Sequence, residues 1–203
     1  MELVAAEKTG SYNLPEVDEI VARCKKGDLE AFDELVAKYQ RFVFTVIYQH
    51  LGKVDDIDDV AQEVFLRVFK FIGRYHGLAS FETWLYKVIL NYIRTHQRRR
   101  SLLGRFFIEH HERTDDSGKS FDVTTQLVET TENPANSIEH RRVVEEIMEV
   151  VRHLPSMYRE ALIMREVNEL SYEEIAGVLG VSMGTVRSRL NRAREMIRRK
   201  VNL

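Results

Sequence analysis

The sequence predicts an all-α protein of two small helical domains joined by a polar, flexible linker, the second domain containing a helix-turn-helix. One observation is compositional: only three prolines and ten glycines, the residues that most destabilise a helix interior, occur among 203 residues. A second is the 3.6-residue apolar period over residues 16–100, which returns from residue 138 to the end. The intervening residues, 101–137, are mostly polar, without a helical stripe, and are predicted as the linker.

Three segments of the first domain carry the helical period. The first follows Asp28, a suitable N-cap, and the second begins with acids that favour a helix N-terminus. The loop GRYHGLAS contains two glycines and interrupts the pattern, and Ser80 is placed to cap the helix that follows. The segments are DLEAFDELVAKYQRFVFTVIYQHL, DDIDDVAQEVFLRVFKFI and SFETWLYKVILNYIRTHQRRR.

The linker begins with an apolar patch, SLLGRFFI at 101–108, which is suited to pack on the first domain. The second domain, 138–203, starts with HRRVVEEIMEVVRHLP, a helix that Pro155 ends. SMYREALIMREVNEL is the next predicted helix, with Ser156 as a candidate cap.

Residues 170–200, LSYEEIAGVLGVSMGTVRSRLNRAREMIRRK, predict the helix-turn-helix. Ser171 and Glu174 fit a capping box, Gly180 permits the backbone to reverse, and Ser182 is placed to cap the second helix. Val186, Leu190, Ala193 and Ile197 recur at helical spacing and are predicted to face the core. The side chains predicted to face outward, where they suit contacts with DNA bases and phosphates, are Thr185, Arg187, Ser188, Asn191 and Arg192.

Charge is segregated along the chain, although the net charge is only −2. Residues 54–63 carry five acids and no base, whereas 91–105 and 185–200 are rich in arginine. Basic clusters attract phosphate, and an acidic face suits a protein partner, so the pattern argues against a protein that only binds DNA.

Several classes of protein are disfavoured by what the sequence lacks. It has no apolar run long enough for a membrane span, no secretion signal and a single cysteine, Cys24, which together predict a cytoplasmic location. His110 and His111 have no cysteine at metal-binding spacing, so we expect no metal. Neither a Ser-His-Asp arrangement nor a phosphate-binding loop is present, so we expect no cofactor and no enzymatic activity.

Two stretches in the right order carry a specific resemblance. LPSMYREALIMREVNEL followed by LSYEEIAGVLGVSMGTVRSRLNRAREMI resembles region 4 of sigma factors, which reads the −35 promoter element. DVAQEVFLRVFKFIGRYHGLASFETWLYKVILNYIRTHQRRR resembles region 2. The chain is therefore similar to the extracytoplasmic-function (group IV) sigma factors of the sigma-70 family, which implies core RNA polymerase, promoter DNA and an anti-sigma factor as partners.

The resemblance also implies roles for individual residues of the first domain. In the family, a helix beginning D-x-x-Q-E binds the largest polymerase subunit, and a loop after it captures a flipped base of the melted −10 element. Trp84 is assigned to core packing. The polymerase-binding residues implied are Asp59, Gln62, Glu63, Phe65 and Phe69. The −10 residues implied are Tyr75, His76, Gly77 and Leu78 in the loop, Asn91 on the helix, and Arg94, Arg98, Arg99 and Arg100 for strand phosphates.

Two other functions are compatible with parts of this sequence. An autonomous regulator with a C-terminal helix-turn-helix explains residues 156–200 equally well, but not the arginine-rich stretch at 91–105 or the aromatic loop before it. Such a regulator is usually a dimer on a palindromic site, whereas a sigma factor binds once, together with polymerase. A small helical enzyme has no support beyond unassigned histidines.

Overall fold

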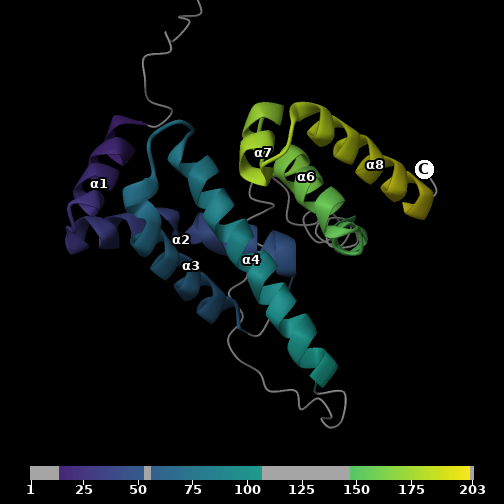
Figure 1. Cartoon of the computed structure of the whole chain (residues 1–203), viewed down its shortest axis with the longest axis horizontal. Helices are drawn as coiled ribbons and strands as arrows, with labels where there is room; N and C mark the ends of the chain where they lie inside the picture. Colours follow the sequence, from purple (N-terminus) through teal and green to yellow (C-terminus); the bar gives the residue numbers. More distant parts are fainter. Residues whose placement is uncertain (1–13, 53–55, 107–146, 202–203) are drawn as a thin grey trace, which may run out of the picture.

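The computed structural model describes residues 14–52, 56–106 and 147–201, and every regular element in these ranges is helical. The helices form two groups that pack against each other along α4 (Figure 1). The all-α class with two helical domains is confirmed. The predicted linker from residue 107 onward and the predicted helix up to residue 146 lie outside the described ranges.

The first domain consists of four α-helices and one short 3-10 turn. They are α1 (Pro15–Lys25), α2 (Leu29–Leu51), α3 (Ile57–Phe71), η1 (Ile72–Arg74) and α4 (Phe81–Phe106). Asp28 caps α2 as predicted, since its Oδ1 accepts from the Ala31 backbone N–H at 3.0 Å. The apolar faces of α1, α3 and α4 close on α2, where Leu35, Val43 and Ile47 are fully buried.

Helix α4 extends further than the sequence suggested. The predicted linker began at residue 101, but α4 continues to Phe106. The continuation is consistent with helix propensity, because residues 98–103 are arginines, leucines and a serine, and the first glycine within α4 is Gly104. The helix begins as predicted at Ser80, whose Oγ accepts from the Thr83 backbone N–H at 3.1 Å.

The second domain contains a helical segment at 147–152, then α6 (Ser156–Glu166), α7 (Tyr172–Leu179) and α8 (Met183–Val201). The predicted capping box of α7 is formed: Glu174 N–H donates to Ser171 Oγ at 3.2 Å, and Ser171 N–H donates to Glu174 Oε2 at 2.8 Å. Gly180 is left-handed, with φ +68°, and turns the chain into α8. Ser156 does not cap α6, because the helix already begins at this residue and Pro155 takes the N-cap position.

A hydrogen-bonded polar pair is buried where the first domain meets the second. His50 Nε2 lies 2.8 Å from the hydroxyl of Tyr86, and both side chains are almost completely shielded from water. Burial, reinforced by the positive charges of Arg159 and Arg94, lowers the pKa of His50 to about 3. The imidazole is therefore neutral in the folded protein at neutral and mildly acidic pH.

The buried imidazole makes stability dependent on pH. Between pH 6.5 and pH 3 the unfolded chain binds a proton at His50 and the folded chain does not, so stability falls as pH falls, by about 1.4 kcal/mol per unit. Urea unfolding should therefore give a stability at pH 5.5 that is lower than at pH 7.5 by about 1.4 kcal/mol from this group, and His50→Gln should remove that difference. Tyr86→Phe, which leaves His50 buried, should retain it. An unchanged slope in His50→Gln would contradict the assignment.

Candidate nucleic-acid and polymerase interfaces

The face of α3 predicted to bind polymerase is exposed. Asp59, Gln62 and Glu63 all point to solvent, as expected from their spacing of three and four residues. Phe69 is 46% exposed and meets Phe32 of α2 edge-to-face, with ring centroids 5.0 Å apart. Phe65 is half-buried against the core. Leu66, 55% exposed and absent from the predicted set, adds a further apolar group, so this surface is acidic at one end and apolar at the other.

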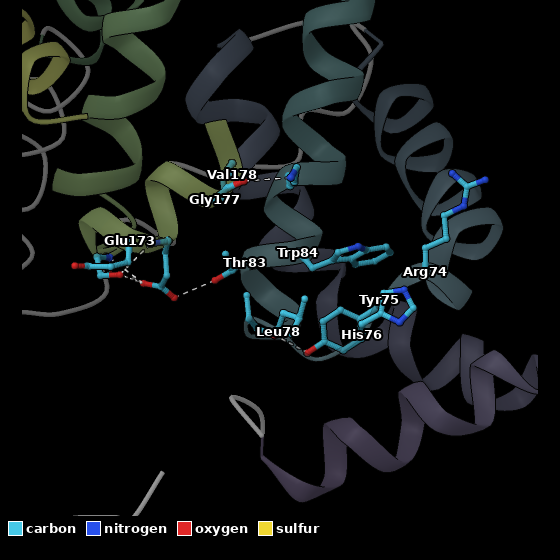
Figure 2. Close-up of a pocket in the computed structure, with 13 residues that line it drawn as sticks. Arg74, Tyr75, His76, Leu78, Thr83, Trp84, Glu173, Gly177 and Val178 are labelled. Atoms are coloured by element: carbon cyan, nitrogen blue, oxygen red, sulfur yellow. Dashed lines mark hydrogen bonds between the residues drawn. The ribbon is translucent and has the colours of Figure 1, made fainter. Parts of the chain in front are cut away.

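The loop between η1 and α4 borders a cavity of about 770 Å³. Figure 2 shows His76, Leu78 and Trp84 around this space, with α7 of the second domain on its other side. Leu78 is 85% exposed at the loop tip, and Gly77 takes φ +70°, a conformation that favours glycine. Three of the four predicted loop residues, Tyr75, His76 and Leu78, thus line one cavity. Trp84 and Lys87 line it too, and an aromatic ring near a basic side chain is suited to hold a flat base.

Tyr75 differs from the expectation that it stacks on a base. Its side chain is only 4% exposed, and its hydroxyl donates to the Ala79 carbonyl at 2.8 Å. The backbone carbonyl of Tyr75 in turn accepts from Lys25 Nζ at 2.6 Å. Tyr75 therefore fixes the shape of the loop from beneath.

Trp84 combines packing with a place on the cavity wall. The indole lies 5.5 Å from the Phe81 ring and 5.7 Å from the Tyr75 ring, which agrees with the predicted packing role. It is only half-buried and also lines the cavity. Of the three aromatic rings in this cluster, the Trp84 ring is the one partly exposed to solvent.

The residues expected to hold strand phosphates lie on the second half of α4. Asn91, Arg98 and Arg99 are exposed and available to DNA. The side chain of Arg100 lies outside what the structure describes. Arg94 is instead bound to Glu160 of α6, through Nε to Oε1 at 3.0 Å and Nη2 to Oε2 at 2.6 Å. These hydrogen bonds raise the pKa of the Arg94 guanidinium against the opposing effect of burial.

The outer face of α8 has the orientation that the sequence predicted. Arg187, Ser188, Asn191 and Arg192 are exposed and Thr185 is partly exposed, whereas Val186, Leu190 and Ala193 are fully buried. Ser182 caps the helix, its Oγ accepting from the Thr185 backbone N–H at 3.2 Å. Arg192 lies 3.7 Å from Glu195 Oε2 but its side chain remains 69% exposed, and Arg187 is also exposed, so both guanidinium groups on the face predicted to read bases are open to solvent.

The contact between the domains was not anticipated from the sequence. Besides Arg94 and Glu160, it joins Thr83 and Tyr86 of α4 to Glu174 and Asn168 of the second domain. One signal was available: Glu160 directly precedes the apolar run Ala161–Met164, where an acid needs a partner if it is buried. Its partner comes from 66 residues earlier in the chain, which no local pattern reveals.

Metal-ligand clusters and membrane-spanning helices are both absent from the part of the chain that the structure describes. No group of three or more His, Cys, Asp or Glu side chains in these ranges is arranged to hold a metal ion. Among the helices that the structure describes, none is both long and apolar enough to cross a membrane.

Comparison with protein families gives two matches in the order of the two domains. Residues 35–102 match Sigma-70 region 2, and residues 144–197 match Sigma-70, region 4. The ECF RNA polymerase sigma-E factor of Haemophilus influenzae is 36% identical over 187 residues, which cover 90% of this chain and 93% of that protein. The RNA polymerase sigma-H factor of Pseudomonas aeruginosa is 34% identical, covering 88% and 90%.

Solved structures share the fold. The chain is similar to CnrH, solved with the cytosolic domain of CnrY (TM-score 0.58, 23% identity, 91% of this chain and 96% of that one). It is also similar to the sigma factor RpoE of Bartonella quintana, solved with the anti-sigma factor NepR (TM-score 0.62, 16% identity, 85% and 97%). With both regions matched and full-length relatives above 30% identity, the chain belongs to the sigma-70 family, as an ECF sigma factor.

Proposed function

We propose that this protein directs core RNA polymerase to specific promoters by reading their −10 and −35 elements, and that it initiates transcription there without catalytic activity of its own. The observation that carries the proposal is that one chain presents three separate surfaces. These are the mixed acidic and apolar face of α3, the loop cavity with its arginine-bearing helix, and the exposed basic face of α8. A polymerase subunit that positions DNA uses all three, whereas an autonomous DNA-binding protein needs only the last.

Each part of the chain has its own role in the proposal. Residues 16–100 bind polymerase and read the melted −10 element, 101–137 connect the domains, and 138–203 read the duplex −35 element. The work takes place in the cytoplasm, where the polymerase is. Sequestration by an anti-sigma factor is part of the proposal, supported by a sigma factor of the same fold, RpoE of Bartonella quintana, which was solved with the anti-sigma factor NepR.

The function can be tested directly by transcription in vitro. Purified protein and core polymerase would be supplied with a library of genomic fragments, and the transcripts sequenced. We expect initiation at a small set of sites that share two elements at fixed spacing. The absence of sequence-selective initiation, with a core enzyme that is active with another sigma factor, would refute the proposal.

The exposed face of α8 should determine −35 recognition. Arg187→Ala or Arg192→Ala should weaken promoter use by about 1–3 kcal/mol if the arginine reads a base, or weaken all sequences evenly if it holds a phosphate. Arg194→Ala is the matched control, since it removes the same charge from α8 but its guanidinium is bound to Glu166 at 2.6 Å. Wild-type transcription by both test variants would show that this face is not the reading surface.

The exposed face of α3 should bind polymerase. Gln62→Ala combined with Glu63→Lys should reduce affinity for core enzyme at least about tenfold, or about 1.4 kcal/mol, because a lysine would replace an acid on a surface suited to a basic partner. Glu19→Lys makes the same charge change at an exposed site on α1 and should bind normally. Circular dichroism would verify the helical content. Undiminished affinity in a quantitative pull-down would exclude this face.

A further inference from the structure

The side of α4 that faces the second domain makes four polar contacts with it. Residues 83, 86, 87 and 94 share one side of the helix because they are spaced at three, four and eleven residues. Thr83 Oγ1 donates to Glu174 Oε1 at 3.0 Å, and Tyr86 Oη donates to Asn168 Oδ1 at 3.1 Å. Lys87 Nζ donates to the Gly177 carbonyl at 3.1 Å. The fourth contact joins Arg94 to Glu160.

The Arg94–Glu160 pair is the charged centre of this contact. Both carboxylate oxygens of Glu160 accept from the guanidinium, in the parallel geometry that gives the strongest ion pairs. The Glu160 side chain is only 6% exposed, although it belongs to the second domain and its cation belongs to the first. A buried carboxylate without a partner is strongly destabilising. Docking on α4 therefore stabilises the second domain, because Arg94 supplies the positive charge that Glu160 needs.

The same guanidinium is one that the proposed function assigns to DNA. Arginine binds carboxylate and phosphate through the same fork of N–H donors, and the Nε and Nη2 donors of Arg94 that hold Glu160 cannot bind a phosphate at the same time. Glu160 therefore occupies the position at Arg94 that a phosphate of the −10 strand would take. Glu173, Glu174 and Val178 of α7 line the loop cavity on its other side, so a base entering this space would also meet the second domain (Figure 2).

We propose that the second domain is an intramolecular cover for the −10 reading surface, with Glu160 acting as a phosphate mimic at Arg94, so that docking of the domains and binding of the −10 strand exclude each other. The inference rests on the proposed role of α4 in binding the −10 strand. It adds that the free chain holds its own −10 surface closed. The outer face of α8 stays exposed in the docked arrangement, so only one of the two DNA-reading surfaces is covered.

The test measures docking and strand binding separately. Spin labels at exposed Lys26 and Lys200, each changed to cysteine in a Cys24→Ala background, would report the distance between the domains by double electron–electron resonance. We expect one narrow distance distribution for this reference protein and a broad one for Glu160→Gln, which removes the charge but keeps the shape. Glu166→Gln is the control, because that acid of α6 pairs with Arg194 inside the second domain. It should keep the narrow distribution.

Strand binding is measured by fluorescence anisotropy with a labelled single-stranded oligonucleotide that carries the −10 element of a promoter found in the transcription experiment. Coupling between sites typically changes affinity about 5- to 150-fold, and Glu160→Gln should bind more tightly by a factor in this range. The exchange Arg94→Glu with Glu160→Arg should restore the narrow distribution, since the pair is re-formed with reversed charge, but should not restore strand binding.

Three results would overturn the proposal. They are equal strand affinity of wild type and Glu160→Gln, a narrow distance distribution that persists in Glu160→Gln, and a narrow distribution that persists with the strand bound. None of them would affect the proposed function, which stands or fails on selective transcription with core enzyme. If transcription is selective and the strand separates the domains, both conclusions hold.

Discussion

Replacing Phe81 with alanine is expected to lower the free energy of unfolding by about 3–5 kcal/mol, as for other fully buried aromatic side chains. Phe81 has no exposed surface, and its ring lies 5.1 Å from Tyr39, 5.6 Å from Tyr75 and 5.5 Å from Trp84, measured between ring centroids. Removing the ring leaves a cavity shared by α2, α4 and the loop. The measurement is urea unfolding followed by circular dichroism.

Leu78→Ala is the control for the Phe81 experiment. Leu78 is also apolar and belongs to the loop beside Phe81, but it is 85% exposed, so its removal should change stability by less than about 0.5 kcal/mol. Equal effects of the two substitutions would show that the aromatic cluster is not the support of this loop. Because Tyr75 and Trp84 rest on Phe81, we also expect Phe81→Ala to impair −10 recognition at temperatures where the variant remains folded.

Most of the fold could be predicted from sequence because its determinants are local. Asp28, Ser80, Ser171 and Ser182 each precede a helix, and each side chain accepts the hydrogen bond expected of an N-cap. Ser156 fails the same rule because Pro155, which suits the start of a helix through its fixed φ, precedes it and takes the cap position.

The candidate sites were predictable to a smaller extent. Helical period alone placed Arg187 and Arg192 on the outer face of α8, and both are exposed. The helical spacing of apolar residues could not show that Tyr75 lies beneath the loop, because the loop has no regular backbone. Tyr75 is held there by contacts with Lys25 and the Phe81 ring. Nor could it show the docking of the domains, which depends on contacts between residues 66 to 91 positions apart.

The docking of the two domains gives core polymerase a second role in promoter binding, besides fixing the spacing of the domains. With the domains simply tethered, polymerase would serve mainly to fix their spacing, because binding at two linked sites depends on how the connection sets the effective concentration. On the proposal that Glu160 covers Arg94, the −10 surface is also closed until the domains separate. Polymerase binding to α3 and to the second domain would then supply the free energy that separates the domains. The separation would expose the DNA-binding surface.

The chain alone should therefore bind duplex promoter DNA poorly, and core polymerase should be required for tight binding. The basic face of α8 offers few phosphate contacts by itself, and non-specific affinities of this kind are about 10⁻⁴–10⁻⁶ M at physiological salt. Opening the −10 element adds a few kcal/mol of unstacking for each extruded base, which a small domain with a covered surface does not recover. With core enzyme, affinity should reach the range of specific complexes, about 10⁻⁸ M or tighter.

A fluorescence titration of labelled duplex promoter, with and without core enzyme at physiological salt, measures the difference, and a duplex with both elements scrambled is the control. Tight, sequence-specific binding by a dimer of the chain alone would contradict the requirement for polymerase and support an autonomous regulator, since a dimer reading a palindrome needs neither an acidic face on α3 nor an opened strand.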